Sequence, residues 1–214
     1  MKMRSHSKTV FGPLQWTNLV LLFSTVSVIL ITPAAGFPAQ VLGGSLDSPV
    51  RIEVFSDFQC PSCRELYLDV MRRVLVEYSK QNKVCVIYHE FPLPTHQYSW
   101  EAARYAEAAG RLGQQKMLMV YDALYMNQSS WAQDGKLDAA ISKVLSREDL
   151  QKLKKIMQDP GINAAIEKGV QLARQNRLNS TPTFFIYSGQ RQLQKVEGRL
   201  TFVSLKQYLD RILQ

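Results

Sequence analysis

Two cysteines three residues apart, Cys60 and Cys63, are the residues best suited to chemistry in this 214-residue chain. They follow a β-type run at residues 50–55 and precede a helix-type run at residues 65–71. Side chains three residues apart share one face of a helix, so the two sulfur atoms can meet. Partial positive charge at a helix N-terminus favours a thiolate at Cys60, and Pro61 suits the first helical turn. The pair therefore predicts a redox-active dithiol at a strand-to-helix turn.

The remaining cysteine and the charge pattern indicate no further chemistry. Cys85 lies in the β-type run 84–88, where a buried thiol acts as a small hydrophobic residue. The formal net charge of +8 is spread along the sequence rather than gathered in a basic stripe. Without such a stripe or a recognisable fold signature, we expect no nucleic-acid partner.

The first 36 residues have the pattern of an export signal. Basic residues at positions 2, 4 and 8 precede an apolar run at residues 19–31, and small residues follow at 32–36. This order is typical of a secretory signal peptide. The alternative is a membrane anchor over residues 14–36, although the apolar run is shorter than the roughly 20 residues that span a bilayer. Both interpretations place the domain in the periplasm or on the extracytoplasmic face of the membrane, where disulfides persist.

The rest of the chain divides into three parts. Residues 45–95 predict a β-α-β unit, residues 96–178 a helical insertion, and residues 179–214 a β-β-α unit. Neither set of strands is large enough to fold alone, so the strands on both sides of the insertion must share one sheet. The sequence therefore predicts an α/β fold with a central mixed sheet flanked by helices.

Local signals place several boundaries. We expect the first strand at residues 50–56, after a turn-rich segment at 43–49. Within the insertion, Ser146 and Asp149 form a capping box, and Asp159-Pro160 is a second helix start. The polar stretch 127–135 is expected to form a loop.

Three segments together resemble one family, the DsbA-like thiol–disulfide oxidoreductases, which are thioredoxin-fold proteins of the bacterial envelope. The segments are Phe55-Ser56-Asp57-Phe58-Gln59-Cys60-Pro61-Ser62-Cys63, Phe91-Pro92-Leu93 with His96, and Ser180-Thr181-Pro182-Thr183-Phe184-Phe185. The resemblance covers about residues 45–214 and implies a thioredoxin-like fold with a DsbA-type helical insertion.

The resemblance also implies a role for each matching residue. Cys60 is the sulfur that attacks or is attacked, and Cys63 is its more buried, resolving partner. Pro182 is similar to the cis-proline that faces the dithiol in this family, which leaves the backbone of Thr181 free to bind an extended substrate as an added strand. The alternative for Pro182 is a trans proline at the first residue of a strand.

Two further positions bear on redox tuning. The dipeptide Pro61-Ser62 departs from the Pro-His of DsbA, so no imidazole charge stabilises the Cys60 thiolate and the direction of electron flow stays open. Thioredoxin-fold enzymes often hold a buried carboxylate that relays the proton of the second cysteine. Glu53 is the candidate, one residue further from Cys60 than expected, and an exposed glutamate on a strand face is the equal alternative.

The resemblance implies an oxidase that forms disulfides in unfolded or reduced exported proteins through a Cys60–Cys63 disulfide and needs no other cofactor. A membrane quinone-linked partner of the DsbB or vitamin K epoxide reductase type would re-oxidise it. A reductase with the same fold is the nearest alternative. A different class of alternative is a non-enzymatic protein, either chaperone-like or binding copper or zinc through the two cysteines with His89 and His96.

Overall fold

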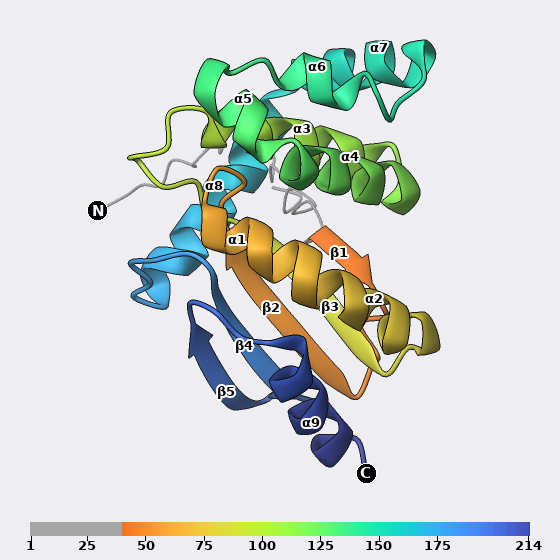
Figure 1. Ribbon diagram of the computed structural model, residues 1–214, viewed down its shortest axis with the longest axis vertical. Coiled ribbons are helices and arrows are strands. Elements are labelled where there is room, and N and C mark those ends of the chain that lie inside the picture. Colours follow the sequence, from red (N-terminus) through yellow and green to blue (C-terminus); the bar gives the residue numbers. More distant parts are fainter. Residues whose placement is uncertain (1–39) are drawn as a thin grey trace, which may run out of the picture. The chain divides into compact units, whose positions relative to one another are not determined.

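The computed structural model describes residues 40–214, so the predicted signal peptide or anchor at residues 1–36 lies outside the described residues. A five-stranded sheet with the order β1-β3-β2-β4-β5 forms the centre (Figure 1). The neighbouring strands β2 and β3 are parallel, and the remaining three pairs of neighbours are antiparallel. The predicted mixed sheet is therefore confirmed. The strands are β1 (Gln40–Gly43), β2 (Val50–Ser56), β3 (Val84–Glu90), β4 (Thr183–Ser188) and β5 (Arg191–Glu197).

Helices form the connection between β2 and β3 and the connection between β3 and β4. The helix expected after the two cysteines is built from four consecutive segments, one of them a π-helical turn of a kind that often occurs at functional sites. These segments are α1 (Pro61–Glu65), η1 (Leu66–Met71), α2 (Arg72–Glu77) and η2 (Ser79–Gln81). Between β3 and β4 lie α3 (Ser99–Arg111), α4 (Gln114–Met126), α5 (Gln128–Asp134), α6 (Leu137–Ile141), α7 (Arg147–Ile156) and α8 (Pro160–Gln175), and α9 (Phe202–Ile212) follows the hairpin.

Side-chain alternation along β2 separates two apolar clusters. Ile52 and Val54 face the larger cluster, which contains both active-site cysteines and the inner faces of α1, α2 and α9. Phe55 faces the other way and packs with Phe185 and with Val170 of α8. Figure 1 shows α1, α2 and α9 in front of the sheet. The sheet is thus covered on both faces, as burial of parallel strands requires.

Two sequence expectations were wrong. The chain already forms a strand before residue 45, because β1 pairs with the edge of β3 and buries Leu42. Residues 127–135 are not a loop, since α5 spans most of them. The sequence of α5 is mostly polar, but one face of the helix is buried. On that face Trp131 Nε1 donates to the Leu124 carbonyl at 2.7 Å. Both helix starts are confirmed, with Ser146 accepting from the Asp149 N–H and Asp159 from the Gly161 N–H.

A buried carboxyl in α3 makes stability depend on pH. Burial raises the pKa of Glu107 to about 7, although a hydrogen bond from Gln40 and the charge of Arg111 oppose the shift. The unfolded chain releases this proton near its ordinary pKa of 4.5. Between these values the folded state binds more protons, so the free energy of unfolding falls as pH rises.

We therefore expect Glu107→Gln to weaken this pH dependence. As pH rises from about 5 to about 8, the free energy of unfolding should fall by up to about 3 kcal/mol less in the variant than in the wild type. Urea unfolding at a series of pH values measures the difference. Glu101→Gln, on the exposed side of the same helix, is the control. Parallel pH profiles for wild type and Glu107→Gln would contradict the assignment.

Candidate active site

The two cysteines lie where β2 passes into α1, at the N-terminus of the helix. Cys60 is the N-cap residue in extended conformation, and its carbonyl accepts from the N–H groups of Cys63 and Arg64, both at 3.1 Å. Pro61 begins the helix and is exposed, and Ser62 is half-buried. The local geometry is the one that the spacing predicted.

The two thiols have opposite acidities. A hydrogen bond from Cys63 is the largest influence on Cys60 and lowers its pKa to about 6, although burial and the charge of Asp57 oppose the shift. Burial raises the pKa of Cys63 well above its ordinary value, and the adjacent Cys60 raises it further. Near neutral pH the reduced pair is therefore a Cys60 thiolate that accepts a hydrogen bond from the Cys63 thiol.

Alkylation should reveal this asymmetry. Because only the thiolate is nucleophilic, we expect the reaction of reduced protein with iodoacetamide to rise with pH and reach half its plateau rate near pH 6. The modification should fall on Cys60, as read by peptide mass spectrometry. A midpoint near the ordinary thiol pKa of 9 would show that the Cys60 thiolate is not stabilised.

The loop before β4 forms the wall opposite the dithiol. The Thr181–Pro182 peptide bond is cis, as the sequence predicted. Cys60 Sγ lies 3.4 Å from the Thr181 carbonyl oxygen, to which it donates when Cys60 is a thiol, and this contact joins positions that are 121 residues apart in the sequence. On its other side the Pro182 carbonyl accepts from the N–H of Gly198 at 2.8 Å. The fold thus brings Thr181 and Pro182 to the dithiol.

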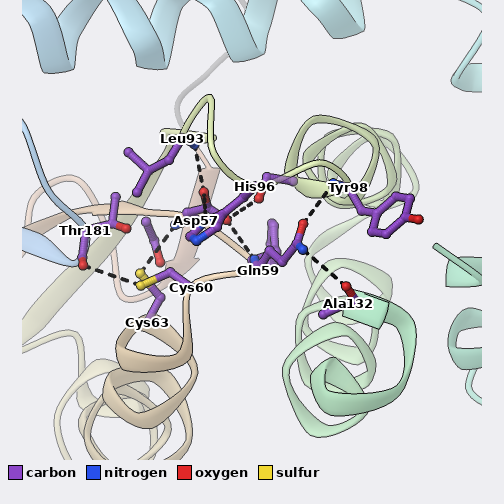
Figure 2. A network of polar contacts seen from close by, with 12 residues as sticks. Asp57, Gln59, Cys60, Cys63, Leu93, His96, Tyr98, Ala132 and Thr181 are labelled. Carbon is purple, nitrogen blue, oxygen red and sulfur yellow. Dashed lines mark hydrogen bonds and ion pairs between the residues drawn. The ribbon is translucent and has the colours of Figure 1, made fainter. Parts of the chain in front are cut away.

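A buried carboxylate, Asp57, holds the loop in front of the cysteines (Figure 2). Its side chain is fully buried and accepts four hydrogen bonds from groups of three segments. The donors are the Gln59 N–H at 2.7 Å, the Leu93 N–H at 2.7 Å, His96 Nδ1 at 2.8 Å and the Ser99 hydroxyl. Asp57 therefore ties the active-site loop to the segment after β3 and to the start of α3.

Helix α5 supports the same loop from the insertion. Gln128 Nε2 donates to the carbonyls of Phe58 at 2.6 Å and Cys60 at 3.0 Å. Gln59 Nε2 donates to the Ala132 carbonyl at 3.2 Å, as Figure 2 shows. The helical insertion thus fixes the backbone that carries the attacking sulfur.

Glu53 does not meet the dithiol. Its place on β2 puts the side chain on the face opposite Ile52 and Val54, away from the cluster that contains Cys63. There the carboxylate accepts from Arg51 Nε at 2.6 Å and contacts His89 Nε2 at 3.0 Å. The expectation of a proton relay through Glu53 is corrected, because the extra residue in the spacing turns the side chain to the other face.

Replacing Glu53 by glutamine should therefore leave thiol chemistry unchanged. We expect the pKa of Cys60 and the reduction potential of the cysteine pair to match the wild type, because the carboxylate lies behind the sheet. Alkylation rates against pH and equilibration with glutathione measure the two quantities. A potential that shifts by more than about 30 mV, the equivalent of roughly 1.4 kcal/mol, would restore Glu53 as a relay.

The other candidate metal ligands do not converge on the cysteines. His89 stacks on Phe55 behind the sheet with a centroid distance of 4.7 Å, and His96 is bonded to Asp57. Within residues 40–214, no group of three or more His, Cys, Asp or Glu residues could hold a metal ion. Cys85 is buried in β3, and burial raises the pKa of its thiol.

Comparison with known proteins agrees with this geometry. A family model described as thioredoxin matches residues 38–211. The chain belongs to the thioredoxin family. A probable disulfide bond formation protein D of Bacillus cereus is 26% identical over 147 residues, 67% of this chain and 68% of the relative.

Solved structures confirm the DsbA-like form of this thioredoxin-family fold. A cysteine variant of alpha-DsbA1 from Wolbachia pipientis has a TM-score of 0.69 at 19% identity, over 82% of this chain and 90% of that one. A thioredoxin-like oxidoreductase from Silicibacter pomeroyi has a TM-score of 0.65 at 26% identity, over 81% and 91%. With its cysteine pair, this thioredoxin-family chain is a thiol–disulfide oxidoreductase.

Sequence reasoning missed two residues that shape the site of this thioredoxin-family protein. Asp57 stood inside the segment that carried the family resemblance, but nothing local showed that its carboxylate is buried. Gln128 stood in the stretch interpreted as a loop. The four hydrogen-bond donors around one aspartate are a tertiary feature. The only signal in the sequence was an acidic residue between Ser56 and Phe58, three residues before a reactive cysteine.

Proposed function

We propose that this protein is an envelope oxidase that forms disulfides in exported proteins through a Cys60–Cys63 disulfide. The observation that carries the proposal is the position of Cys60 at the helix N-terminus beside the Cys63 thiol and the Thr181 carbonyl, where the pKa of Cys60 is lowered to about 6 and that of Cys63 is raised. A stabilised Cys60 thiolate stabilises the reduced pair, and a disulfide whose reduced form is stable gives up its oxidising equivalents readily.

The proposed reaction has two exchanges. A substrate thiolate attacks Cys60 Sγ, which forms a substrate–Cys60 disulfide and breaks the bond to Cys63, whose sulfur leaves with the electron pair. A second substrate thiolate attacks the substrate sulfur of this mixed disulfide, and Cys60 leaves as a thiolate. The substrate loses two electrons, the enzyme gains them, and Cys63 takes one proton.

Thr181 and Pro182 form the proposed substrate-binding wall. The Thr181 carbonyl oxygen already lies 3.4 Å from Cys60 Sγ, so the backbone of this residue is beside the reacting sulfur. An extended peptide that bonds to this backbone as an added strand would bring its own sulfur to Cys60. Pro61 and Ser62 border the same sulfur and are the proposed tuning positions.

The biological setting is also part of the proposal. Extracytoplasmic location follows from the interpretation of residues 1–36 and from relatives named for disulfide bond formation. Within residues 40–214, no helix has the length and apolarity to cross a membrane. The proposed partners are reduced exported proteins and a quinone-linked membrane oxidase of the DsbB or vitamin K epoxide reductase type. The redox-active cysteines serve in place of a separate cofactor.

One observation favours a reductase as the second candidate. The charge of Asp57 raises the pKa of Cys60, and Ser62 brings no cationic charge to offset it. Both features make the reduced form less stable than a site with an imidazole in the dipeptide.

Matched assays separate the two directions. Disulfide-bonded enzyme is mixed with a reduced, unfolded protein that contains two cysteines, and reduced enzyme with the oxidised form of the same protein. Quenching with acid and mass spectrometry then give both rate constants. We expect the oxidation of the substrate to be the faster reaction. Faster reduction would favour the reductase and overturn the oxidase proposal.

A further inference from the structure

The surroundings of Cys63 contain hydroxyl groups that the proposed reaction has not used. Cys63 Sγ is buried and accepts the Asp57 N–H at 3.4 Å. The Ser56 hydroxyl, from the residue just before Asp57, adjoins this sulfur and lowers the pKa of its thiol. Behind it, Ser56 Oγ lies 2.8 Å from Tyr125 Oη in a contact that is entirely buried. A chain of donors therefore runs from α4 through the end of β2 to the sulfur.

The acidic groups of the described residues near this sulfur are engaged elsewhere. Glu53 lies on the other face of the sheet, and the carboxylate of Asp57 accepts four hydrogen bonds that point away from Cys63. Glu90 accepts from Tyr121 Oη at 2.7 Å. The hydrogen-bonding neighbours of the Cys63 sulfur are thus neutral donors rather than a carboxylate.

We propose that Ser56 is a catalytic hydrogen-bond donor to the Cys63 sulfur and that Tyr125 is the positioning residue that orients it. The inference deepens the proposed function and rests on it only for the direction of reaction, because the same sulfur–sulfur bond opens in either direction.

The role of the donors follows from where charge develops. When a thiolate attacks Cys60 Sγ, the Cys60–Cys63 bond breaks and its electron pair goes to Cys63, a buried site in which negative charge is costly. Ser56 O–H then donates to the Cys63 thiolate while Tyr125 O–H donates to Ser56 Oγ. The Asp57 N–H is the second donor. The hydroxyls keep their protons, and Cys63 takes its proton from solvent as it becomes the thiol that donates to Cys60.

The molecule offers a matched control in Tyr88. Its ring also packs against Tyr67 and Tyr121 in the same cluster, and its hydroxyl is buried near Cys63. Among the described residues, however, the Tyr88 hydroxyl has no hydrogen-bond partner. Tyr88→Phe therefore removes a buried hydroxyl from this environment without breaking the chain of donors.

The first experiment measures how fast glutathione opens the Cys60–Cys63 disulfide. Ser56→Ala should lower the second-order rate constant about ten-fold and Tyr125→Phe about three-fold, as expected for donors to a charged and to a neutral group. The double variant should be no slower than Ser56→Ala alone, because Tyr125 acts through Ser56. Tyr88→Phe should react at the wild-type rate. Circular dichroism and thermal unfolding check that each variant is folded.

The second experiment isolates Cys63 in a Cys60→Ala background and follows its thiolate by ultraviolet absorbance. Adding Ser56→Ala should raise the pKa of Cys63, whereas adding Tyr88→Phe should not. A merely structural role for Ser56 would leave this titration unchanged.

The outcomes are distinguishable from those of the matched assays of substrate oxidation and reduction. Unchanged opening rates and an unchanged Cys63 titration in Ser56→Ala would overturn this inference and leave the oxidase proposal standing. An equal loss in Tyr88→Phe would also overturn it, because buried polarity in general would then explain the effect. If the enzyme instead proves to be a reductase while the Ser56 effects appear, the inference holds and only the direction changes.

Discussion

Cys60→Ser is expected to reduce thiol–disulfide exchange to the uncatalysed rate. The hydroxyl of serine is not ionised near neutral pH and cannot form the mixed disulfide, whereas the Cys60 thiol ionises with a pKa of about 6. Oxidative refolding of a reduced protein substrate, followed by the return of its native activity, measures the loss.

Two further variants make this result specific. Cys63→Ser, mixed with the disulfide-bonded form of the substrate, should retain attack by the Cys60 thiolate on that disulfide and accumulate a mixed disulfide, visible on a non-reducing gel, because the resolving sulfur is missing. Cys85→Ser is the matched control and should keep full activity, since Cys85 is buried in β3 and its pKa is raised by burial. Exchange that survives Cys60→Ser would place the nucleophile elsewhere.

The largest effect on stability is expected from Asp57→Ala. The substitution removes a fully buried acceptor from four donors, namely the groups of Gln59, Leu93, His96 and Ser99. We expect the free energy of unfolding to fall by about 3–5 kcal/mol, as for other buried networks that lose one partner. Urea denaturation of the reduced protein measures it.

Asp210→Ala is the matched control for this prediction. Asp210 also accepts hydrogen bonds, from Tyr78 Oη at 2.5 Å and Lys206 Nζ at 2.9 Å, but its side chain is nearly half exposed. Water replaces those bonds, so the loss should be far smaller. Similar losses in the two variants would show that burial does not give Asp57 its importance.

The features that the sequence predicted were local or carried by the family resemblance. The spacing of Cys60 and Cys63 requires only a helix start, and the strand before it has an apolar pattern that can be seen directly. Pro182 was expected opposite the dithiol because the resemblance implied it. The four-residue strand β1 was too short to give a pattern, and it is recognisable only by its pairing with β3.

The failures have two physical origins, an ambiguous apolar pattern along one strand and contacts between distant segments. Along β2 the alternation Ile52, Glu53, Val54 already places Glu53 opposite the core face, but Phe55 is apolar as well and obscures which face is which. The importance of Asp57 depends on its hydrogen bonds to the segment that follows β3. The importance of Gln128 depends on the contact between α5 and the active-site loop. Such contacts become visible only once the elements are packed.

The reduction potential of the Cys60–Cys63 couple tests the account most directly. The protein is equilibrated with mixtures of reduced and oxidised glutathione, and the fraction of disulfide is read by mass spectrometry after acid quenching. A stabilised Cys60 thiolate predicts a value above that of thioredoxin, about −270 mV. A potential at or below that of thioredoxin would contradict the proposal that this protein is an oxidase.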